Sequence, residues 1–447
     1  MLEADIVVVG GSAAGLTAAI TARRHYPQRK TLLVRTEDKV LIPCGIPYIY
    51  GTVGSPDKNL IPDAALEKNS IELLKSTATG IDRENKVLKT EAGDVKYDRL
   101  IIATGSTPIV PPVPGMDKPG VYTIKKDVPY LAGLQEKLKD AQKVVIIGGG
   151  FIGIEFADEI NKLGGKEVTV VELMPHCLGL AYDEEFCVEM EKHLAERGVT
   201  ISCCSKVTEI TGDGPFEVAL ENGSRIPADV VILGIGARAN TTLAAEAGLD
   251  IGATGGVAVD QYMKTTDDNI FACGDCAEKV SFFGGKPSPL KLASIATLEA
   301  RIAGANLFSL RRESPGTVGV WGTAVADLAM ATAGLTESLA KRMGYDVVAA
   351  AVEGPNRHPG CMPGAASIKL KLVFEKAGGT LLGGQVRGDA SCGEIVNAIS
   401  ACVQQKMTAE DIAMFQSGTH PALTASPIAY ALVNAAEMAA GQMRSAQ

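Results

Sequence analysis

The sequence predicts an α/β protein with two dinucleotide-binding units and a smaller α+β domain behind them. Glycine-rich turns occur at residues 10–15 and again at residues 148–153, and each lies between a short apolar run and a helical pattern. One such turn is weak evidence, but two in the same strand–turn–helix setting argue against coincidence. From about Val318 the pattern changes to strand-like runs followed by Ala- and Met-rich helices, which indicates a third domain.

The first unit opens with residues 4–9, a short apolar run that ends in glycine, as is typical of a buried parallel strand. The turn Gly10-Gly-Ser12-Ala13-Ala-Gly15 follows, with serine at the middle glycine of the dinucleotide fingerprint. We expect its first glycine to make the tight turn and its last to allow close helix–strand packing. A pyrophosphate would then lie at the N-terminus of the helix predicted over residues 16–25.

A second strand is predicted over residues 31–34, and Arg35 and Glu37 at its end are both candidates to face an adenosine. Residues 97–105 predict another strand that ends in the turn Ala103-Thr104-Gly105, and the breaker-rich residues 111–115 mark a linker. Much later, a strand ending in Gly274-Asp275 and a helix over residues 291–307 are expected to complete this unit.

The second unit contains a cleaner fingerprint, Gly148-Gly-Gly150-Phe-Ile152-Gly153-Ile-Glu155, directly after the apolar residues 144–147. Its second strand, over residues 167–171, ends in Glu172. A carboxylate at this place accepts hydrogen bonds from both ribose hydroxyls and repels a 2′-phosphate. Because Leu173 and Met174 follow and supply no cation for such a phosphate, we expect NADH to be preferred and NADPH to be the less favoured donor.

In the third domain, strands are predicted over residues 367–374 and 381–386, with a hairpin at Gly378-Gly379. Helices are predicted over 391–404 and 427–440, and their apolar character is typical of a core or a subunit interface. The predicted limits are 1–113 with 245–317 for the first domain, 114–244 for the second and 318–447 for the third.

Composition excludes several classes of partner for the 447-residue chain. The net charge of −9 gives no footprint for nucleic acid or for an anionic membrane. Glu3 and Asp5 precede the apolar residues 6–20, which argues against a signal peptide, and no uninterrupted apolar run is long enough to cross a bilayer. We therefore expect a soluble, cytoplasmic protein.

Cys44 lies in a turn set by Pro43, Gly45 and Pro47, after the second strand of the first unit. A thiol there would lie beside any nucleotide that this unit binds, whereas the alternative is a buried structural cysteine. The ten cysteines show no small-domain disulfide framework and no paired zinc-ligand spacing, so no metal site is predicted. The pair Cys273 and Cys276 lacks a thioredoxin-like context, and Cys203-Cys204 are expected to be strand residues without a redox role.

Together these motifs resemble the flavin- and pyridine-nucleotide-dependent disulfide reductase superfamily, over nearly the whole chain. The two fingerprints, the Ala103-Thr104-Gly105 turn and the Ala272-Cys-Gly274-Asp275 segment occur in that superfamily in this order. The resemblance implies that the first unit binds FAD, that the second binds NAD(P)H and that the third domain makes a homodimer. It implies an FAD site of Gly10, Ser12, Ala13, Gly15, Arg35, Glu37, Pro43, Ala103, Thr104, Gly105, Gly274 and Asp275, and an NAD site of Gly148, Gly150, Ile152, Gly153, Glu155, Glu172 and Gly236.

Within the superfamily, residues 43–48 resemble the single-cysteine branch, which includes coenzyme A disulfide reductases, persulfide and polysulfide reductases, NADH oxidases and NADH peroxidases. The two-cysteine branch has a partner thiol five residues on, where this chain has Ile49. Cys44 is therefore expected to cycle through a mixed disulfide, a persulfide or a sulfenic acid.

Three departures affect the choice of substrate. Ala13 stands where NADH peroxidases and many NADH oxidases carry a histidine. Residues 358–365, His-Pro-Gly-Cys-Met-Pro-Gly-Ala, lack the paired tyrosines of coenzyme A disulfide reductases. His420-Pro421 resembles the acid motif of the two-cysteine enzymes, but Ala425 replaces the glutamate that orients it.

The sequence thus predicts an FAD enzyme that takes hydride from NADH and passes electrons through Cys44 to a disulfide, persulfide or polysulfide, with coenzyme A as a possible carrier. The alternatives are an NADH oxidase that reduces dioxygen, and a non-catalytic flavin redox sensor or electron-transfer subunit. Glu155 is expected near the nicotinamide, although a solvated position is the simpler alternative. Arg23 and Arg24 fit either a solvated face or the phosphates of coenzyme A.

The proton for the released thiolate needs a donor that titrates near neutral pH, and histidine is that side chain. Of five histidines, His420 matches the acid motif, with a satisfied interface histidine as the alternative. We expect His420 to donate the proton across the dimer interface, which would make the active site composite.

Overall fold

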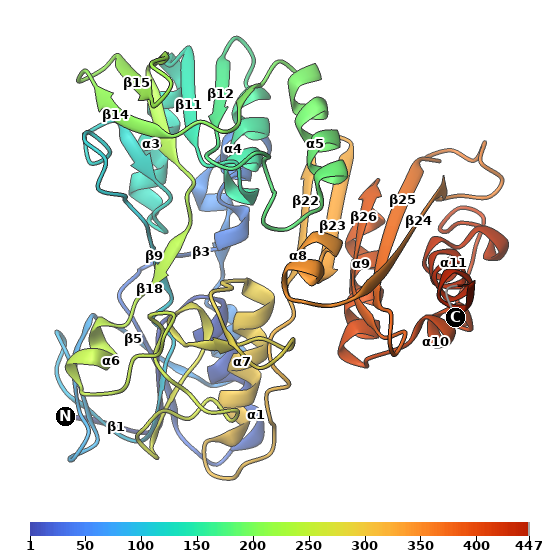
Figure 1. Cartoon of the computed structure of the whole chain (residues 1–447). Coiled ribbons are helices and arrows are strands. Elements are labelled where there is room, and N and C mark those ends of the chain that lie inside the picture. The colour runs from blue at the N-terminus through green and yellow to red at the C-terminus, as the bar shows by residue number, and fades with distance from the viewer. Residues whose placement is uncertain (446–447) are drawn as a thin grey trace. The chain divides into compact units, whose positions relative to one another are not determined.

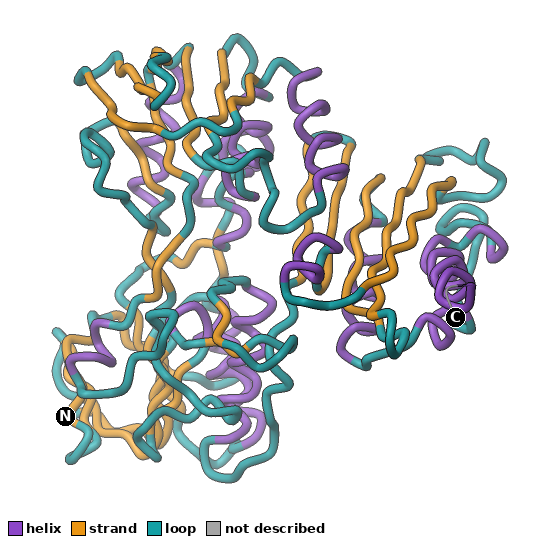
Figure 2. Tube along the Cα trace, in the orientation of Figure 1, coloured by secondary structure: helices purple, strands orange, loops and turns teal. Residues whose placement is uncertain are grey.

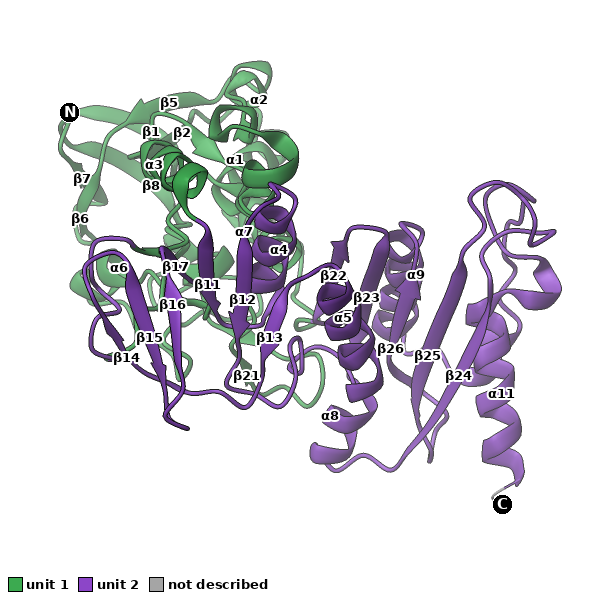
Figure 3. Cartoon of the chain, turned by 90° about the horizontal axis from the view of Figure 1, so that it is seen from above, with its two compact units in different colours: residues 1–112, 121–141, 235–317 green, residues 113–120, 142–234, 318–447 purple. Residues whose placement is uncertain are grey.

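The computed structural model describes residues 1–445, which fold into two compact units. The first comprises residues 1–112, 121–141 and 235–317, and the second comprises residues 113–120, 142–234 and 318–447, with the last two residues of that range outside the description (Figure 3). This division differs from the three domains expected from the sequence, whose limits stay a prediction. None of the helices within residues 1–445 is both long and apolar enough to cross a membrane.

The first unit is built on a mostly parallel sheet, of which β1 and β5 are labelled in Figure 1. Its order is β5 (Glu72–Lys75), β2 (Thr31–Arg35), β1 (Leu2–Val9), β8 (Val95–Ile102), β7 (Val87–Thr90) and β6 (Ala78–Asp82), and β19 (Ile270–Ala272) pairs with β8. Strands β5, β2, β1, β8 and β19 are parallel, and β7 and β6 continue the sheet in antiparallel pairing.

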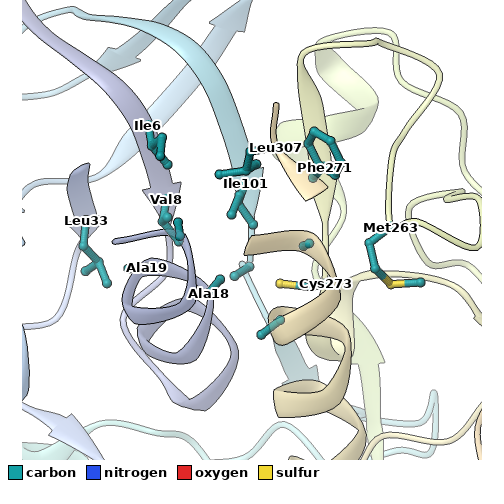
Figure 4. Packing of buried hydrophobic residues seen from close by; sticks show 14 of the residues in the cluster. Ile6, Val8, Ala18, Ala19, Leu33, Ile101, Met263, Phe271, Cys273 and Leu307 are labelled. Atoms are coloured by element: carbon teal, nitrogen blue, oxygen red, sulfur yellow. The ribbon is translucent and has the colours of Figure 1, made fainter. Parts of the chain in front are cut away.

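The central strand β1 is apolar on both faces, as a sheet covered on both sides requires. Ile6 and Val8 belong to one buried cluster and Val7 and Val9 to another. The first cluster includes residues of α1 (Ala13–His25) and of the segment around α7 (Ala293–Asn306), and Figure 4 shows its packing. Helices α1 and α7 pack closely, since a Cβ at Gly304 would lie 2.7 Å from the Ala18 carbonyl oxygen.

Short elements complete the first unit. Strand β18 pairs with β9, β20 with β21 and β3 with β4, in each case antiparallel. The helices and strands are α2 (Ala64–Lys68), α3 (Val128–Asp140), α6 (Thr242–Glu246), β3 (Val40–Leu41), β4 (Leu60–Ile61), β9 (Ser106–Pro108), β10 (Val121–Thr123), β18 (Ala237–Ala239), β20 (Lys279–Val280) and β21 (Pro287–Ser288).

The second unit contains a parallel sheet, a small antiparallel sheet and a larger antiparallel sheet, which can be followed in Figure 2. The parallel sheet has the order β17 (Val230–Leu233), β11 (Lys143–Ile147), β12 (Glu167–Val171) and β13 (Thr200–Ser202), with helices α4 (Phe151–Asn161) and α5 (Glu184–Glu196). The small sheet consists of β14 (Val207–Thr211), β15 (Phe216–Leu220) and β16 (Arg225–Ala228).

The larger antiparallel sheet confirms the α+β character predicted for the C-terminal part. Its order is β22 (Val320–Val325), β23 (Leu328–Gly334), β26 (Leu381–Gly388), β25 (Ser367–Glu375) and β24 (Val347–Pro355). Helix α9 (Cys392–Gln404) packs against β22, β23 and β26, and α11 (Ala431–Ser445) packs against β24 and β25. Helix α10 (Ala409–Ala413) packs against α11, and α8 (Glu337–Arg342) contacts β24.

Candidate functional site

The first glycine turn has the geometry that its residue types predict. Gly10 has a φ of +116°, and a Cβ there would lie 2.2 Å from the carbonyl oxygen of Ala103. A Cβ at Gly15 would lie 1.9 Å from the Gly10 carbonyl oxygen, so only glycine permits this approach of helix to strand. The turn and the Ala103-Thr104-Gly105 segment, which follows β8, therefore lie side by side in the first unit.

The N-terminus of α1 fits a bound pyrophosphate. Ser12 is the N-cap residue and Ala13 is the first helical residue, and among the described residues no side chain caps this end and no acidic residue lies in the first turn. The exposed N–H groups and the positive end of the helix dipole would attract the phosphates. This uncapped helix end therefore fits the pyrophosphate of FAD.

Arg35 and Glu37, the two candidates for the adenosine side, have different environments. Arg35 is buried, donates to both carboxylate oxygens of Asp63 at 2.6 and 2.8 Å and donates to the carbonyls of Glu37 and Asp38. Its alkyl chain lies against the glycine turn, because a Cβ at Gly11 would be 2.4 Å from Arg35 Cδ. The Glu37 side chain is exposed. Sequence reasoning missed Asp63, which offsets the Arg35 charge.

Asp275 is held on a turn that two buried charges support. The hydroxyl of Ser106 donates to Asp275 Oδ2 at 2.8 Å, and the amide of Gly274 donates to Glu299 Oε2 at 2.8 Å. Lys279, 3.4 Å from Glu299 and also buried, donates to the Gly274 carbonyl at 2.7 Å. Burial raises the pKa of Glu299 to about 7 in spite of the nearby lysine.

Sequence reasoning missed this ion pair, although a glutamate inside the apolar run of α7 was a usable signal.

Cys44 lies in the short 3-10 helix Pro43–Gly45 and is exposed. Asn59 fixes this turn: its amide donates to the Ile42 carbonyl at 2.9 Å, and a Cβ at Gly45 would lie 2.1 Å from Asn59 Oδ1. A π-helix, Ile49–Val53, follows the turn. The chain thus presents the thiol on a supported turn of the first unit, and the alternative of a buried structural cysteine is wrong.

The other cysteines mentioned above have different surroundings. Cys273 and Cys276 are buried, and burial raises the pKa of both thiols. Cys203 and Cys204 follow β13 instead of lying within it, because the strand ends at Ser202. Arg23 donates to the backbone carbonyls of Pro27, Arg29 and Asn69, which fits a structural role, while Arg24 is exposed.

In the second unit, Glu172 lies against the second glycine turn. Its Oε2 accepts from the Gly149 amide at 2.5 Å and its Oε1 accepts from the Met174 amide at 2.7 Å. Gly148 has a φ of +107°, and a Cβ at Gly153 would lie 1.8 Å from the Gly148 carbonyl oxygen. The carboxylate predicted to face the ribose is therefore fixed beside the fingerprint.

The N-terminus of α4 also has room for a ligand. Gly150 is its N-cap residue, and within the described residues a Cβ there would meet no heavy atom within 4 Å. Ile152 is 40% exposed on the first turn. The open, uncapped helix end fits the pyrophosphate of a pyridine nucleotide. Gly236, with a φ of +100°, belongs to the first compact unit, unlike the other residues predicted for this nucleotide.

Glu155 on α4 contacts the C-terminal part of the chain. Thr323 on β22 donates to Glu155 Oε1 at 2.9 Å, and burial raises the pKa of Glu155 to about 7. Beside it, the rings of Phe151 and Trp321 stack with centroids 6.3 Å apart. Sequence reasoning missed Thr323 and Trp321, which no local pattern connects to α4. The simpler alternative of a solvated Glu155 is wrong.

His420 is exposed on a turn that Thr424 closes, because the His420 amide donates to Thr424 Oγ1 at 3.0 Å. Its Nδ1 accepts from the Ala422 amide at 3.2 Å, so a neutral ring carries its proton on Nε2. The turn is tied to His358, whose Nδ1 lies 3.0 Å from the Thr424 carbonyl oxygen. Thr424 thus supports the turn where the expected glutamate is replaced by Ala425.

Comparison with known proteins decides the family. Residues 4–300 match the model of the pyridine nucleotide-disulphide oxidoreductase family, and residues 320–428 match the dimerisation domain of the same family. The chain belongs to this family. The predicted recognition and fold class are thereby confirmed, and the protein is an enzyme, an oxidoreductase, which excludes the non-catalytic sensor. Membership implies FAD and NAD(P)H as cofactors.

The relatives and solved structures that resemble this chain carry names from both candidate activities, sulfur reduction and NADH oxidation. The chain is 32% identical to an NAD(P)H coenzyme A polysulfide/persulfide reductase of Pyrococcus horikoshii, over 87% of this chain and 88% of the relative. It is 31% identical to an NADH oxidase of Enterococcus faecalis, over 92% of this chain and 94% of the relative. An NAD-dependent persulfide reductase from A. fulgidus has a TM-score of 0.91 at 33% identity, covering 99% of this chain and 84% of that one.

Proposed function

We propose that this enzyme is an NADH-dependent flavoprotein that reduces a disulfide, persulfide or polysulfide bond through Cys44. The observation that carries the proposal is the exposed thiol on the turn that Asn59 fixes, in a chain similar to a persulfide reductase over 99% of its length. Bound FAD would supply two-electron transfer between the nicotinamide and the thiol. The cytoplasmic location and the proposed domain limits stay predictions.

The chain's own residues would perform three tasks. The N-termini of α1 and α4 would hold the two pyrophosphates, with Asp275 and Glu172 placed for the sugar hydroxyls. The Cys44 thiolate would attack one sulfur of the substrate, forming a mixed disulfide while the S–S bond breaks and a thiolate leaves. Two electrons and a proton would then cleave the mixed disulfide. For a disulfide substrate, one NADH and one proton thus yield two thiols and NAD⁺, and for a persulfide they yield one thiol, hydrogen sulfide and NAD⁺.

His420 is proposed as the proton donor to the leaving thiolate, through its Nε2–H. In the structure Nδ1 accepts the Ala422 N–H, so this arrangement holds the neutral ring. To act as the acid, the ring would first take up a proton on Nδ1 and give up that hydrogen bond, and the imidazolium would then donate from Nε2. The family's dimerisation domain supports a homodimer, and the donor would then act on the partner subunit's thiol. A coenzyme A-linked acceptor is supported by the Pyrococcus horikoshii relative.

NADH oxidation with dioxygen as acceptor is the second candidate, and the likeness to the Enterococcus faecalis NADH oxidase favours it. Ala13 argues against it, because many NADH oxidases carry a histidine at the matching position. In this reaction Cys44 would cycle through a sulfenic acid.

The two candidates are separated by steady-state NADH oxidation with coenzyme A disulfide, polysulfide or dioxygen as the acceptor. We expect the sulfur acceptors to give the higher kcat/KM. Cys44→Ser should keep FAD and its reduction by NADH, and should lower sulfur-acceptor turnover by about 10³-fold or more, since serine cannot replace the thiolate nucleophile. Cys361→Ser, at another exposed cysteine, is the control. Undiminished sulfur turnover in Cys44→Ser would overturn the relay.

A further inference from the structure

Two cysteines and a glutamate from three separate segments converge in the second unit. Cys177 lies in the loop after β12, Glu191 lies on α5, and Cys203 follows β13. Their ligand atoms, the two Sγ atoms and a carboxylate oxygen, all lie within 4.8 Å of one another. Within the described part of the chain, this is the group of His, Cys, Asp and Glu side chains that could hold a metal ion.

Glu191 forms hydrogen bonds with both cysteines, to the backbone of one and to the sulfur of the other. Its Oε1 accepts from the Cys177 amide at 2.7 Å and from Cys203 Sγ at 3.5 Å. Its other oxygen, Oε2, lies 3.2 Å from His176 Nδ1, which fixes the orientation of the carboxylate. Ligand carboxylates of metal sites are commonly held by a further hydrogen bond of this kind.

The three side chains are partly shielded from solvent. Cys177 is buried, and Cys203 and Glu191 are half-buried. A cation held between their ligand atoms would therefore be partly enclosed by protein, with one side open for a water ligand.

We propose that Cys177, Cys203 and Glu191 bind a zinc ion, with water as the fourth ligand. Two sulfurs and one oxygen suit zinc, whereas calcium and magnesium prefer oxygen ligands alone. In a tetrahedral site the two sulfurs would be about 3.8 Å apart, which the present separations reach with a small contraction. Zinc binding would release the two thiol protons to solvent, and nothing is oxidised or reduced.

The site would fasten the segment that carries Glu172 to the rest of the unit. Cys177 Sγ lies against the fingerprint, since a Cβ at Gly149 would be 2.5 Å from it. Glu172 and Met174 are linked to the end of β13 through backbone bonds from Ser205 and Cys204, at 2.9 and 3.0 Å. Zinc would therefore stabilise the part of the second unit that carries Glu172. It would take no part in the reaction proposed for Cys44.

The test uses the full-length FAD-loaded enzyme, purified under anaerobic conditions, freed of metal with a chelator and titrated with zinc. We expect about one zinc ion per chain, a higher midpoint of thermal unfolding with zinc, and a thiolate-to-metal charge-transfer band with cobalt(II). Cys203→Ser and the isosteric Glu191→Gln should each weaken zinc affinity by about tenfold or more. The adjacent, exposed Cys204→Ser is the matched control and should keep the affinity.

Two results would overturn the proposal. One is zinc uptake that is absent in the wild type, or unchanged in both Cys203→Ser and Glu191→Gln while each variant keeps the wild-type circular dichroism spectrum. The other is a Cys177–Cys203 disulfide, found by mass spectrometry in the anaerobically purified enzyme, because it would make the pair a redox couple instead of a metal site. Glu191→Gln retains both thiols, so its loss of zinc cannot be blamed on a missing sulfur.

Discussion

At the scale of single residues, two carboxylates in the second unit differ in what their surroundings do to them. Glu172 accepts backbone N–H groups from both Gly149 and Met174, which fix the orientation of its carboxylate. Glu155 is half-buried and accepts from one hydroxyl, that of Thr323, and its partial burial raises its pKa to about 7. Glu172 is suited to bind the ribose hydroxyls proposed for it and to discriminate between NADH and NADPH. Glu155 is suited to hold or release a proton near neutral pH.

Glu172 predicts a preference for NADH. Its fixed charge would repel a 2′-phosphate, and the following residues, Leu173 and Met174, supply no cation. Wild-type kcat/KM should favour NADH by about tenfold or more, which corresponds to about 1.4 kcal/mol. Glu172→Gln should lower the ratio of kcat/KM for NADH to kcat/KM for NADPH, because it removes the repulsion between the carboxylate and the 2′-phosphate. Steady-state kinetics with both nucleotides measure this, and a wild-type preference for NADPH would contradict it.

Glu155 predicts a pH-dependent stability. In the unfolded chain its pKa returns to about 4.3, against about 7 in the fold, so between these values the folded state binds more protons. The contribution of Glu155 to the free energy of unfolding therefore falls by about 3–4 kcal/mol as pH rises through this window and is constant above it. Glutamine does not ionise, so the Glu155→Gln variant does not lose this stability as the pH rises. The unfolding midpoint of the variant, relative to that of the wild type, should therefore be higher at pH 8 than at pH 5.

Thermal unfolding of the NADH-free enzyme at both pH values checks this prediction. Glu196→Gln, at an exposed carboxylate on α5, is the matched control and should show a constant difference from the wild type. A pH-independent difference for Glu155→Gln would show that its carboxyl group is not protonated in the fold.

At the scale of elements, one lysine joins the larger antiparallel sheet to the starts of two helices. Lys371 on β25 contacts Asp183, Glu185 and Glu337 at 2.7–3.1 Å, and Gln385 on β26 also donates to Asp183 at 2.7 Å. Despite opposing burial, hydrogen bonds from Ser338 and Gln385 and the charge of Lys371 lower the pKa of Asp183 to about 2. These contacts fix α5 and α8 on the sheet.

Lys371→Met should lower the free energy of unfolding by about 3 kcal/mol, because it leaves the buried Asp183 without its cation. Lys376→Met, one residue beyond the same strand, removes an exposed lysine paired with Asp346 and should cost less than about 1 kcal/mol. Denaturant unfolding compares the two. Equal effects would show that the Lys371 cluster adds no more than a surface pair.

The sequence predicted the elements better than their side-chain partners. The limits of β12 were predicted correctly, and those of β2 and β25 nearly so, since glycine turns and apolar runs are local signals. The helix expected over 427–440 instead begins at residue 431, after a short 3-10 turn that starts at Pro427.

The partners of the site residues could not be predicted from such patterns. Arg35 pairs with Asp63, and Glu155 with Thr323, across sequence separations of 28 and 168 residues. Periodicity within one element says nothing about contacts over such separations, because tertiary packing alone creates them. For the same reason Asn59, which fixes the Cys44 turn, was missed.

At the scale of the whole molecule, the proposed homodimer makes each active site depend on two subunits. The match of residues 320–428 to the family's dimerisation domain supports the dimer. If Cys44 of one subunit works with His420 of its partner, no isolated subunit holds a complete site. His420→Ala should then slow the sulfur half-reaction by about 10²-fold or more and leave flavin reduction by NADH nearly unchanged.

Mixing Cys44→Ser and His420→Ala subunits tests this dependence. After random re-dimerisation about half of the dimers are mixed, and each contains one intact site, so about a quarter of wild-type activity should return. The double variant mixed with Cys44→Ser builds no intact site and is the control. If mixed dimers regain nothing over that control, the proposal of a shared site fails.

The two-sided apolar character of β1 has a consequence for how the chain reaches its native state. Because Ile6 and Val8 serve one core and Val7 and Val9 the other, a one-residue slip of β1 would still bury hydrocarbon on both faces. Hydrophobicity alone therefore cannot define the pairing register of this strand in the sheet. Gly10 can, since its approach to Ala103 tolerates no Cβ. Gly10, which is proposed to admit the nucleotide, therefore also disfavours a shifted register of β1, so a substitution at this one position would disturb both folding and the proposed binding.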